Sequence, residues 1–169
     1  MTYSKFTTQN RFALPSIRGF SLLEVLITMF VLAFGLLGVA KLQLNALKDV
    51  QNGHYVSIAN NLTQIISNQI LVNKQNLNSY QLGINQIVNT NTNCQSQECS
   101  SGELSNYHLG RWQQRLSKSL PSGKGEIDIN DRQAIITVRW DENKNGSTGL
   151  NCPKLSEQDL DCLIMKRTY

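Results

Sequence analysis

The chain has 169 residues, a formal net charge of +4 and a pI of 8.9. Residues 1–19 hold three of its 16 basic residues and none of its 12 acidic ones, so residues 20–169 carry a net charge of only +1. The basic pI is therefore no evidence for nucleic-acid binding, and the length suits one domain plus a membrane segment. No nucleophile–base pair, phosphate loop or paired-carboxylate motif stands out. We therefore expect that the protein is not an enzyme and has no catalytic residue and no cofactor.

The N-terminal region predicts a membrane anchor. Lys5, Arg11 and Arg18 make residues 1–19 basic, and they precede the segment from Phe20 to Ala40, in which Glu24 is the only charged residue. As a helix this segment is about 31 Å long, enough to cross a bilayer core. Basic residues before a span place its N-terminus in the cytoplasm and the rest of the chain outside. A secretory signal peptide is the alternative, but its apolar region would be shorter.

An acid inside an apolar span is costly and therefore suggests a function and a partner. Gly19-Phe20 followed by Ser21-Leu22-Leu23-Glu24 resembles the cleavage and assembly motif of type IV pilins and of type II secretion pseudopilins. The resemblance implies that a prepilin peptidase removes leader 1–19 between Gly19 and Phe20. It also implies that Phe20 is N-methylated and that Glu24 neutralises the N-terminal amine of a neighbouring subunit. An ordinary signal anchor with a stray acid is the alternative.

The helix is expected to continue beyond the membrane, because no proline interrupts Phe20 to Leu71. Residues of a candidate buried stripe recur at three- and four-residue spacing, with Ile66 and Ile70 beside them: Leu47, Val50, His54, Ile58, Leu62, Ile65 and Gln69. We therefore expect a transmembrane and assembly half at 20–40 and an amphipathic half at 41–72. His54 on this stripe is interpreted as a packing residue, since a ligand or catalytic role would need partners.

Residues 73–169 are expected to form a periplasmic α+β head. Residues 73–99 predict a loop with one short element at 84–88, and the spacing of Ser100 and Glu103 predicts a capping box before a helix over 103–119. Three further segments predict antiparallel strands, the first two forming a hairpin: 125–130, 134–140 and 163–168. The fold class is α+β and pilin-like, with a long N-terminal helix packed against a small antiparallel sheet.

All four cysteines lie beyond the predicted span, on the side where disulfides persist. Three connectivities are possible, and we favour the local pairs Cys94–Cys99 and Cys152–Cys162 because both loops are short. Each disulfide is expected to contribute about 2–3 kcal/mol. The cysteine spacing fits zinc poorly, and residues 141–146 indicate a surface turn rather than a calcium loop because the acid at the twelfth position is missing.

A second resemblance concerns the head. One set of core and turn residues is similar to the globular pattern of PilV-type minor pilins, which are pilus modification proteins: Trp112, Leu116, Leu120, Pro121, Gly123, Gly125, Val138 and Trp140. It implies that both tryptophans are core residues. It also implies a minor pilin that takes part in pilus assembly or priming and is inserted laterally from the inner membrane into the fibre.

The partners implied are other major and minor pilins, the prepilin peptidase and the inner-membrane assembly platform. A type II secretion pseudopilin shares the same N-terminus and stays an alternative. A membrane-tethered module that binds DNA or another ligand is a further alternative, and it would need a clustered basic or aromatic patch. Only a loose set of basic residues is available for one: Arg111, Arg115, Lys118 and Lys124.

Overall fold

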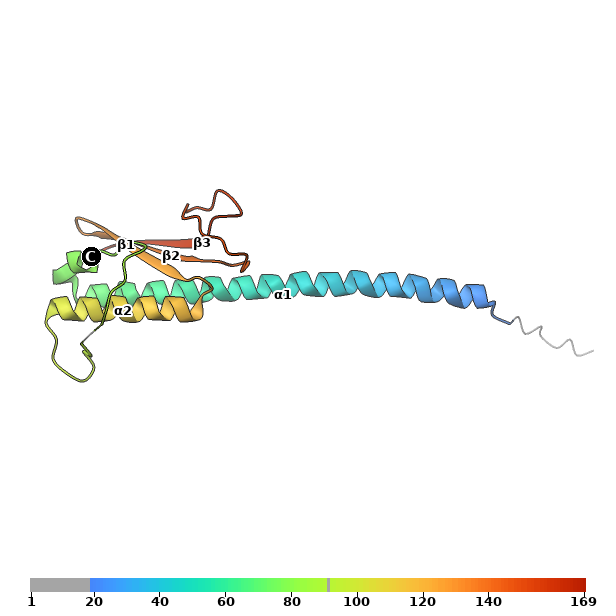
Figure 1. The fold of residues 1–169 in the computed structure, drawn as a ribbon, viewed down its shortest axis with the longest axis horizontal. Coiled ribbons are helices and arrows are strands. Elements are labelled where there is room, and N and C mark those ends of the chain that lie inside the picture. Colours follow the sequence, from blue (N-terminus) through green and yellow to red (C-terminus); the bar gives the residue numbers. More distant parts are fainter. Residues whose placement is uncertain (1–18, 91) are drawn as a thin grey trace, which may run out of the picture. The chain divides into compact units, whose positions relative to one another are not determined.

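The computed structural model describes residues 19–90 and 92–169. Its elements are α1 (Leu22–Val72), the 3-10 helix η1 (Lys74–Tyr80), α2 (Ser101–Ser119), β1 (Lys124–Asn130), β2 (Gln133–Trp140) and β3 (Asp161–Thr168), as labelled in Figure 1. The chain divides into two compact units, one ending at Asn45 and the other, the head, comprising Ala46–Tyr169.

Helix α1 is continuous over 51 residues, which confirms the long helix expected from the absence of proline. Ser21 begins it, because the Ser21 carbonyl accepts the Glu24 and Val25 N–H groups at 3.0 and 3.3 Å. Asn73 ends it with a backbone that has left the helical region, and its N–H still bonds to the carbonyl of Ile70. Only the part of α1 from Ala46 onward belongs to the head.

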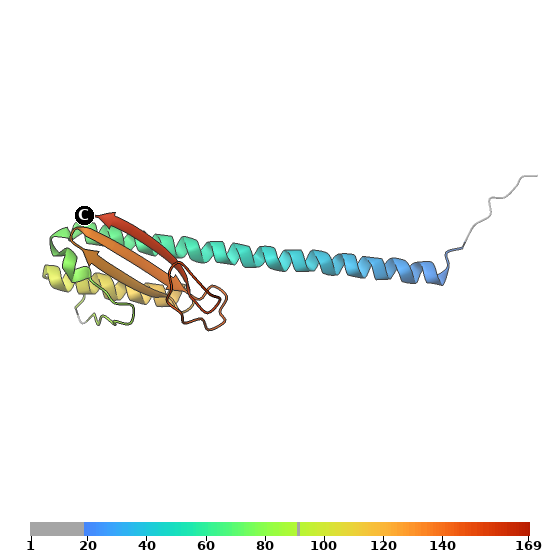
Figure 2. The same cartoon turned by 90° about the horizontal axis from the view of Figure 1, so that it is seen from above.

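The head has two layers. Its three strands form an antiparallel sheet in the order β1-β2-β3, and the later part of α1 and the whole of α2 lie together against one face of it (Figures 1 and 2). The β1–β2 turn passes through Asp131 at φ 53°, a left-handed conformation that aspartate tolerates. The α+β class, the hairpin and the last strand are confirmed, with boundaries shifted by one or two residues.

The core lies between the two layers. Alternate residues of each strand point into it, with Ile127 opposite Ile136 and Ile136 opposite Met165 in the sheet register. Trp112 on α2 is 1 % exposed and donates its indole N–H to the Leu62 carbonyl of α1 at 3.0 Å. Trp140 at the end of β2 is 3 % exposed, so both tryptophans are core residues as expected.

The face that α1 buries agrees with the predicted stripe at Leu62, Ile66 and Ile70 but differs from it nearer the N-terminus. Leu47, Val50 and His54 are exposed. The buried residues begin at Tyr55 and include small and polar side chains: Tyr55, Ala59, Leu62, Thr63, Ile66, Ser67 and Ile70. Thr63 can be buried because its hydroxyl donates to the Ala59 carbonyl at 2.7 Å, which satisfies the polar group. His54, interpreted above as a packing residue, is exposed.

The short element expected at 84–88 is also absent, and the helical turns of this region lie earlier, in η1. Residues 84–88 form a turn followed by irregular chain. Gln113 on α2 holds this segment, since its amide donates to the Gln86 carbonyl at 2.6 Å and its side-chain oxygen accepts the Val88 N–H at 3.0 Å. In this segment, hydrogen bonds from the Gln113 side chain therefore take the place of the backbone hydrogen bonds that a regular element would have formed.

Candidate processing and assembly site

The residues at the N-terminal end of α1 are accessible from solvent and include a defined helix start. Gly19 and Phe20 precede the helix in an exposed segment without regular structure, and Phe20 is 82 % exposed. The Ser21 hydroxyl accepts the Leu23 N–H at 3.3 Å, so Ser21 caps the first turn. A peptide bond between Gly19 and Phe20 is therefore reachable from solvent. Residues 1–18 of the expected leader lie outside the described residues.

Glu24 lies in the first turn of α1. A carboxylate here interacts favourably with the positive end of the helix dipole. Its side chain has no hydrogen bond or ion pair to any of the residues from 19 to 90 or 92 to 169. The charge at the start of the apolar segment thus has no partner within the described part of the chain.

The apolar segment that follows Glu24 is exposed on every side. One window of α1 has a mean hydropathy of 2.5 and none of it is buried, and α1 is the one described helix long and apolar enough to cross a membrane. Phe30 and Phe34, one turn apart, contact each other edge to face. Exposure of such a large apolar surface to water is unfavourable, which favours a surrounding of lipid or of neighbouring apolar helices.

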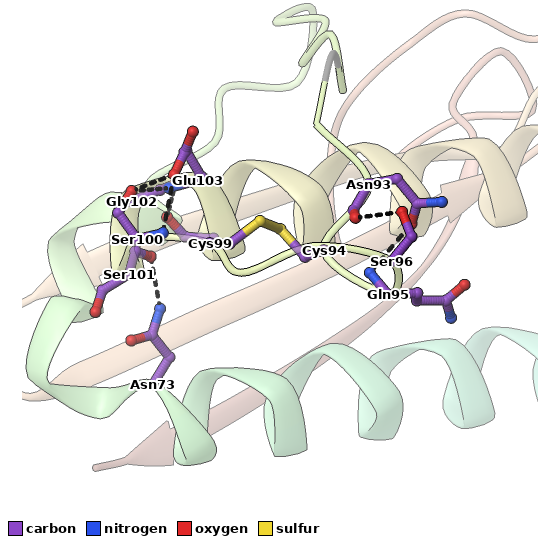
Figure 3. Close-up of a disulfide and its surroundings, with 11 residues drawn as sticks. Asn73, Asn93, Cys94, Gln95, Ser96, Cys99, Ser100, Ser101, Gly102 and Glu103 are labelled. Carbon is purple, nitrogen blue, oxygen red and sulfur yellow. Dashed lines mark hydrogen bonds between the residues drawn. A yellow bond between two sulfur atoms is a disulfide. The ribbon is translucent and has the colours of Figure 1, made fainter.

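The first disulfide joins Cys94 to Cys99 directly before α2 (Figure 3). Ser100 then caps α2: its hydroxyl accepts the Glu103 N–H at 3.3 Å, and the Glu103 carboxylate accepts the Ser100 N–H at 2.8 Å. This is the predicted capping box. Hydrogen bonds from the side chain and the backbone of Ser100 lower the pKa of Glu103. Asn73 ties the same turn to the end of α1 by donating to the Ser101 carbonyl at 2.9 Å.

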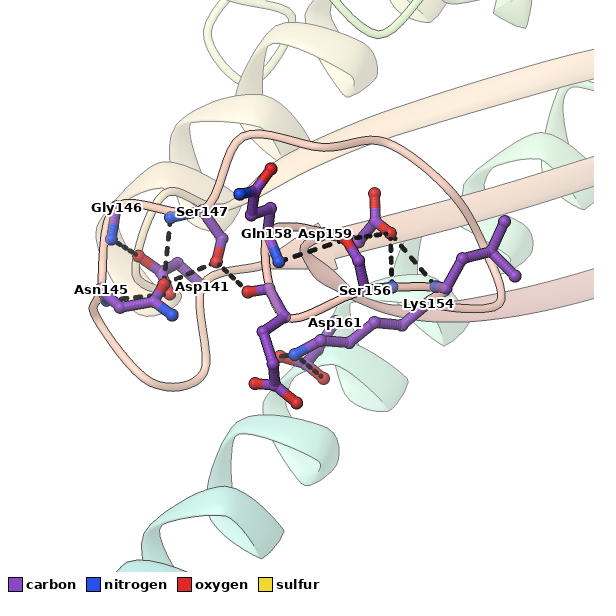
Figure 4. Close-up of polar contacts among 11 residues, drawn as sticks. Asp141, Asn145, Gly146, Ser147, Lys154, Ser156, Gln158, Asp159 and Asp161 are labelled. Atoms are coloured by element: carbon purple, nitrogen blue, oxygen red, sulfur yellow. Dashed lines mark hydrogen bonds and ion pairs between the residues drawn. The ribbon is translucent and has the colours of Figure 1, made fainter.

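The second disulfide joins Cys152 to Cys162 and closes a loop before β3. Asp159 organises this loop, as Figure 4 shows. Its carboxylate accepts the backbone N–H groups of Leu155 and Ser156 at 3.1 and 2.9 Å and the Asn151 amide at 3.0 Å. Burial raises the pKa of Asp159, but the hydrogen bonds from Asn151, Ser156 and Leu155 together bring it below its ordinary value.

Two further polar clusters hold the head together. The Tyr80 hydroxyl lies 2.8 Å from Nδ1 of His108 and links η1 to α2. Burial lowers the pKa of His108 and raises that of Tyr80. On the opposite face of the sheet, Arg139 pairs with Glu126 at 2.9 Å and donates to the Leu150 carbonyl.

Sequence reasoning missed Asp159 and the Tyr80–His108 pair. Tyr80 and His108 lie 28 residues apart, so no local spacing marks this pair. The partners of Asp159 lie only three to eight residues before it, but the loop that brings them together has no recognisable motif. Asp141, considered above as the start of a calcium loop, directs its carboxylate at the N–H groups of Asn145 and Gly146. Among the described residues, no group of three or more histidine, cysteine, aspartate or glutamate residues is placed to hold a metal ion.

A long N-terminal helix that packs its later part on a small antiparallel sheet, with an exposed apolar segment headed by a single acid, has the architecture of pilin-like proteins. The prokaryotic N-terminal methylation motif matches residues 14–40 of this chain. The match includes Gly19, Phe20 and Glu24 together with the apolar segment. It supports a protein of the type IV pilin or pseudopilin kind, anchored in the inner membrane by one helix. No curated protein and no solved structure was found to match the chain.

Proposed function

We propose that the protein is a minor pilin that takes part in the assembly or priming of a type IV pilus. One observation carries the proposal: the methylation motif includes Glu24, which lies at the start of the fully exposed apolar segment of α1. In this proposal residues 1–19 are the leader, 20–40 the membrane and assembly segment and 41–72 the amphipathic half of the helix. Residues 73–169 are the rest of the periplasmic head.

The proposed mechanism begins with cleavage between Gly19 and Phe20 by the prepilin peptidase. Cleavage creates an ammonium group on Phe20, which is then methylated. In a low-dielectric environment this cation and the Glu24 carboxylate of an adjacent subunit attract each other strongly. The subunit then leaves the bilayer sideways, and its apolar segment exchanges lipid for the helices of other major and minor pilins on the inner-membrane assembly platform.

The burial of Trp112 and Trp140 is consistent with the PilV-type pattern and favours a pilus subunit. A type II secretion pseudopilin would share every N-terminal feature. Deletion of the protein in its native host separates the two functions: loss of surface pili with normal protein secretion supports the pilus, whereas normal pili with impaired secretion supports the pseudopilin. Complementation with the intact chain should restore whichever property is lost.

Processing is tested by mass analysis of the N-terminus of protein purified from the native host. We expect Phe20 as the first residue, carrying one methyl group. A Gly19→Leu variant should keep its leader, because a bulky side chain replaces the glycine that the motif requires before the cut. Protein that retains Met1, or that is cut after Ala40, would exclude the pilin mechanism.

The role of Glu24 is tested by comparing Glu24→Ala with Asp49→Ala, which removes an exposed acid from the same helix outside the apolar segment. Because neither acidic side chain has a hydrogen bond or ion pair within the described residues, both variants should accumulate in the membrane at normal levels and be cleaved normally. Only Glu24→Ala should be depleted from sheared pili. Equal recovery of both variants in the fibre would argue against docking through Glu24. Loss of the Glu24→Ala variant from the membrane would show that Glu24 is needed for folding or stability.

A further inference from the structure

The outer edge of β1 is only partly covered by the chain itself. Leu82 forms an antiparallel bridge with Ile127, in which each N–H donates to the carbonyl of the other at 2.9 Å. Two residues further along β1, the Ile129 N–H donates to the side-chain oxygen of Gln81 at 2.7 Å. Residues 81–82 therefore act as a short extra strand along the later half of β1.

The earlier half of the same edge is left open at Gly125. Backbone groups of an antiparallel strand point alternately to its two neighbours, so Gly125 faces outward as Ile127 does. Gly125 is buried, yet its N–H and carbonyl have no hydrogen-bond partner in the part of the chain that the structure describes. Buried backbone groups are nearly always paired, so the N–H and carbonyl of Gly125 are expected to bind a partner.

A groove of about 540 Å³ opens beside Gly125. The chain turns away from β1 immediately after Leu82, with the Gln86 N–H bonded to the Gly83 carbonyl at 3.0 Å, and so leaves this space free. Apolar side chains of Ile84, Ile87 and Val88 contribute to its walls. The groove thus offers an unpaired donor and acceptor next to an apolar wall, which are the features that bind an extended peptide.

The charge around the groove is basic. Lys124 is the one charged residue among those that line it, and it is exposed. Arg115 and Lys118 are exposed on α2, the helix that forms one wall, but neither is among the residues that line the groove, so Lys124 alone sets its charge among the described residues. A partner that carries acidic residues is therefore favoured over a basic one.

We propose that this groove binds a short extended segment of another protein, which pairs with Gly125 and continues the strand begun by residues 81–82. Leu82 shows what the edge accepts, since it lies extended against β1 with its side chain fully buried. The bound segment places an apolar side chain against Ile84 and Val88 and an acidic residue near Lys124. This site is distinct from the N-terminal assembly site.

The test uses the ¹⁵N-labelled full-length chain in detergent micelles and two synthetic peptides, acetyl-EVTVE-amide and acetyl-KVTVK-amide. We expect the acidic peptide to shift the Gly125 amide resonance and slow its hydrogen exchange, and the basic peptide to bind several-fold more weakly. Ser117→Trp fills the groove from its exposed wall and should abolish the shift. Ser119→Trp, a matched change on the same helix away from the lining residues, should leave it intact.

Lys124→Glu provides a second variant that does not depend on filling the groove. It should weaken binding of the acidic peptide and strengthen that of the basic one. If neither peptide moves the Gly125 resonance, the open edge is only hydrated and the proposal fails. Binding that persists in Ser117→Trp, or that is unchanged in Lys124→Glu, would place the peptide elsewhere and would also overturn it.

Discussion

The two buried tryptophans provide a matched measurement of one hydrogen bond. Trp112 and Trp140 are both core residues, but only the indole N–H of Trp112 has a partner, the Leu62 carbonyl. The Trp140 N–H has none among the described residues. Replacing each tryptophan with phenylalanine removes a similar volume from the core, so the difference between the two variants reports on the hydrogen bond.

The expected magnitudes follow from these contacts. Trp112→Phe loses a hydrogen bond with a net contribution of about 1 kcal/mol, in addition to the lost packing. Trp140→Phe loses packing but also removes an unpaired buried donor, whose desolvation costs about 1–3 kcal/mol in the native protein. Trp112→Phe should therefore lower the free energy of unfolding by about 2–4 kcal/mol more than Trp140→Phe does.

The assay is urea unfolding of the full-length chain in micelles, followed by circular dichroism at 222 nm so that the lost fluorophore does not matter. Equal slopes for the two variants would show that the native and unfolded states are comparable. If Trp140→Phe were as destabilising as Trp112→Phe, the bond to Leu62 would contribute nothing measurable and the assignment of Trp140 as an unpaired donor would be refuted.

Three other outcomes test the head. Ser100→Ala removes the cap of α2 and should lower the free energy of unfolding by about 1 kcal/mol, measured in the same urea assay; no change would make the capping box dispensable. Because burial lowers the pKa of His108 below 6.5, the unfolded chain binds its proton first as the pH falls, so stability should decrease below pH 6.5 and His108→Gln should flatten this dependence. A dependence unchanged in the variant would assign it to another group. Peptide mapping without reduction should recover the two local disulfides, and a crossed pairing would contradict the structure.

Local signals in the sequence were enough for most of the framework. The long helix follows from an uninterrupted run without proline, and the helix start of α2 follows from Ser100 and Glu103, because a capping box involves residues only three positions apart. The hairpin follows from the alternation of Ile127 and Ile129 with polar residues and from the short polar link that precedes the apolar segment at 134–140. The motif at Gly19, Phe20 and Glu24 is likewise contained in six residues, which is why it could be read without any structure.

The tertiary structure decided which surfaces these elements bury. Sequence periodicity placed His54 on the packing stripe, whereas His54 is exposed and the fold buries Thr63 and Ser67. The Thr63 hydroxyl donates to the Ala59 carbonyl of its own helix. The Ser67 hydroxyl instead bonds with Tyr169 and accepts from Arg167, both about 100 residues away in the chain. The Tyr80–His108 pair and the open backbone of Gly125 depend on contacts between segments distant in the chain. Such contacts exist only after packing brings the segments together, so no pattern within a single segment could have predicted them.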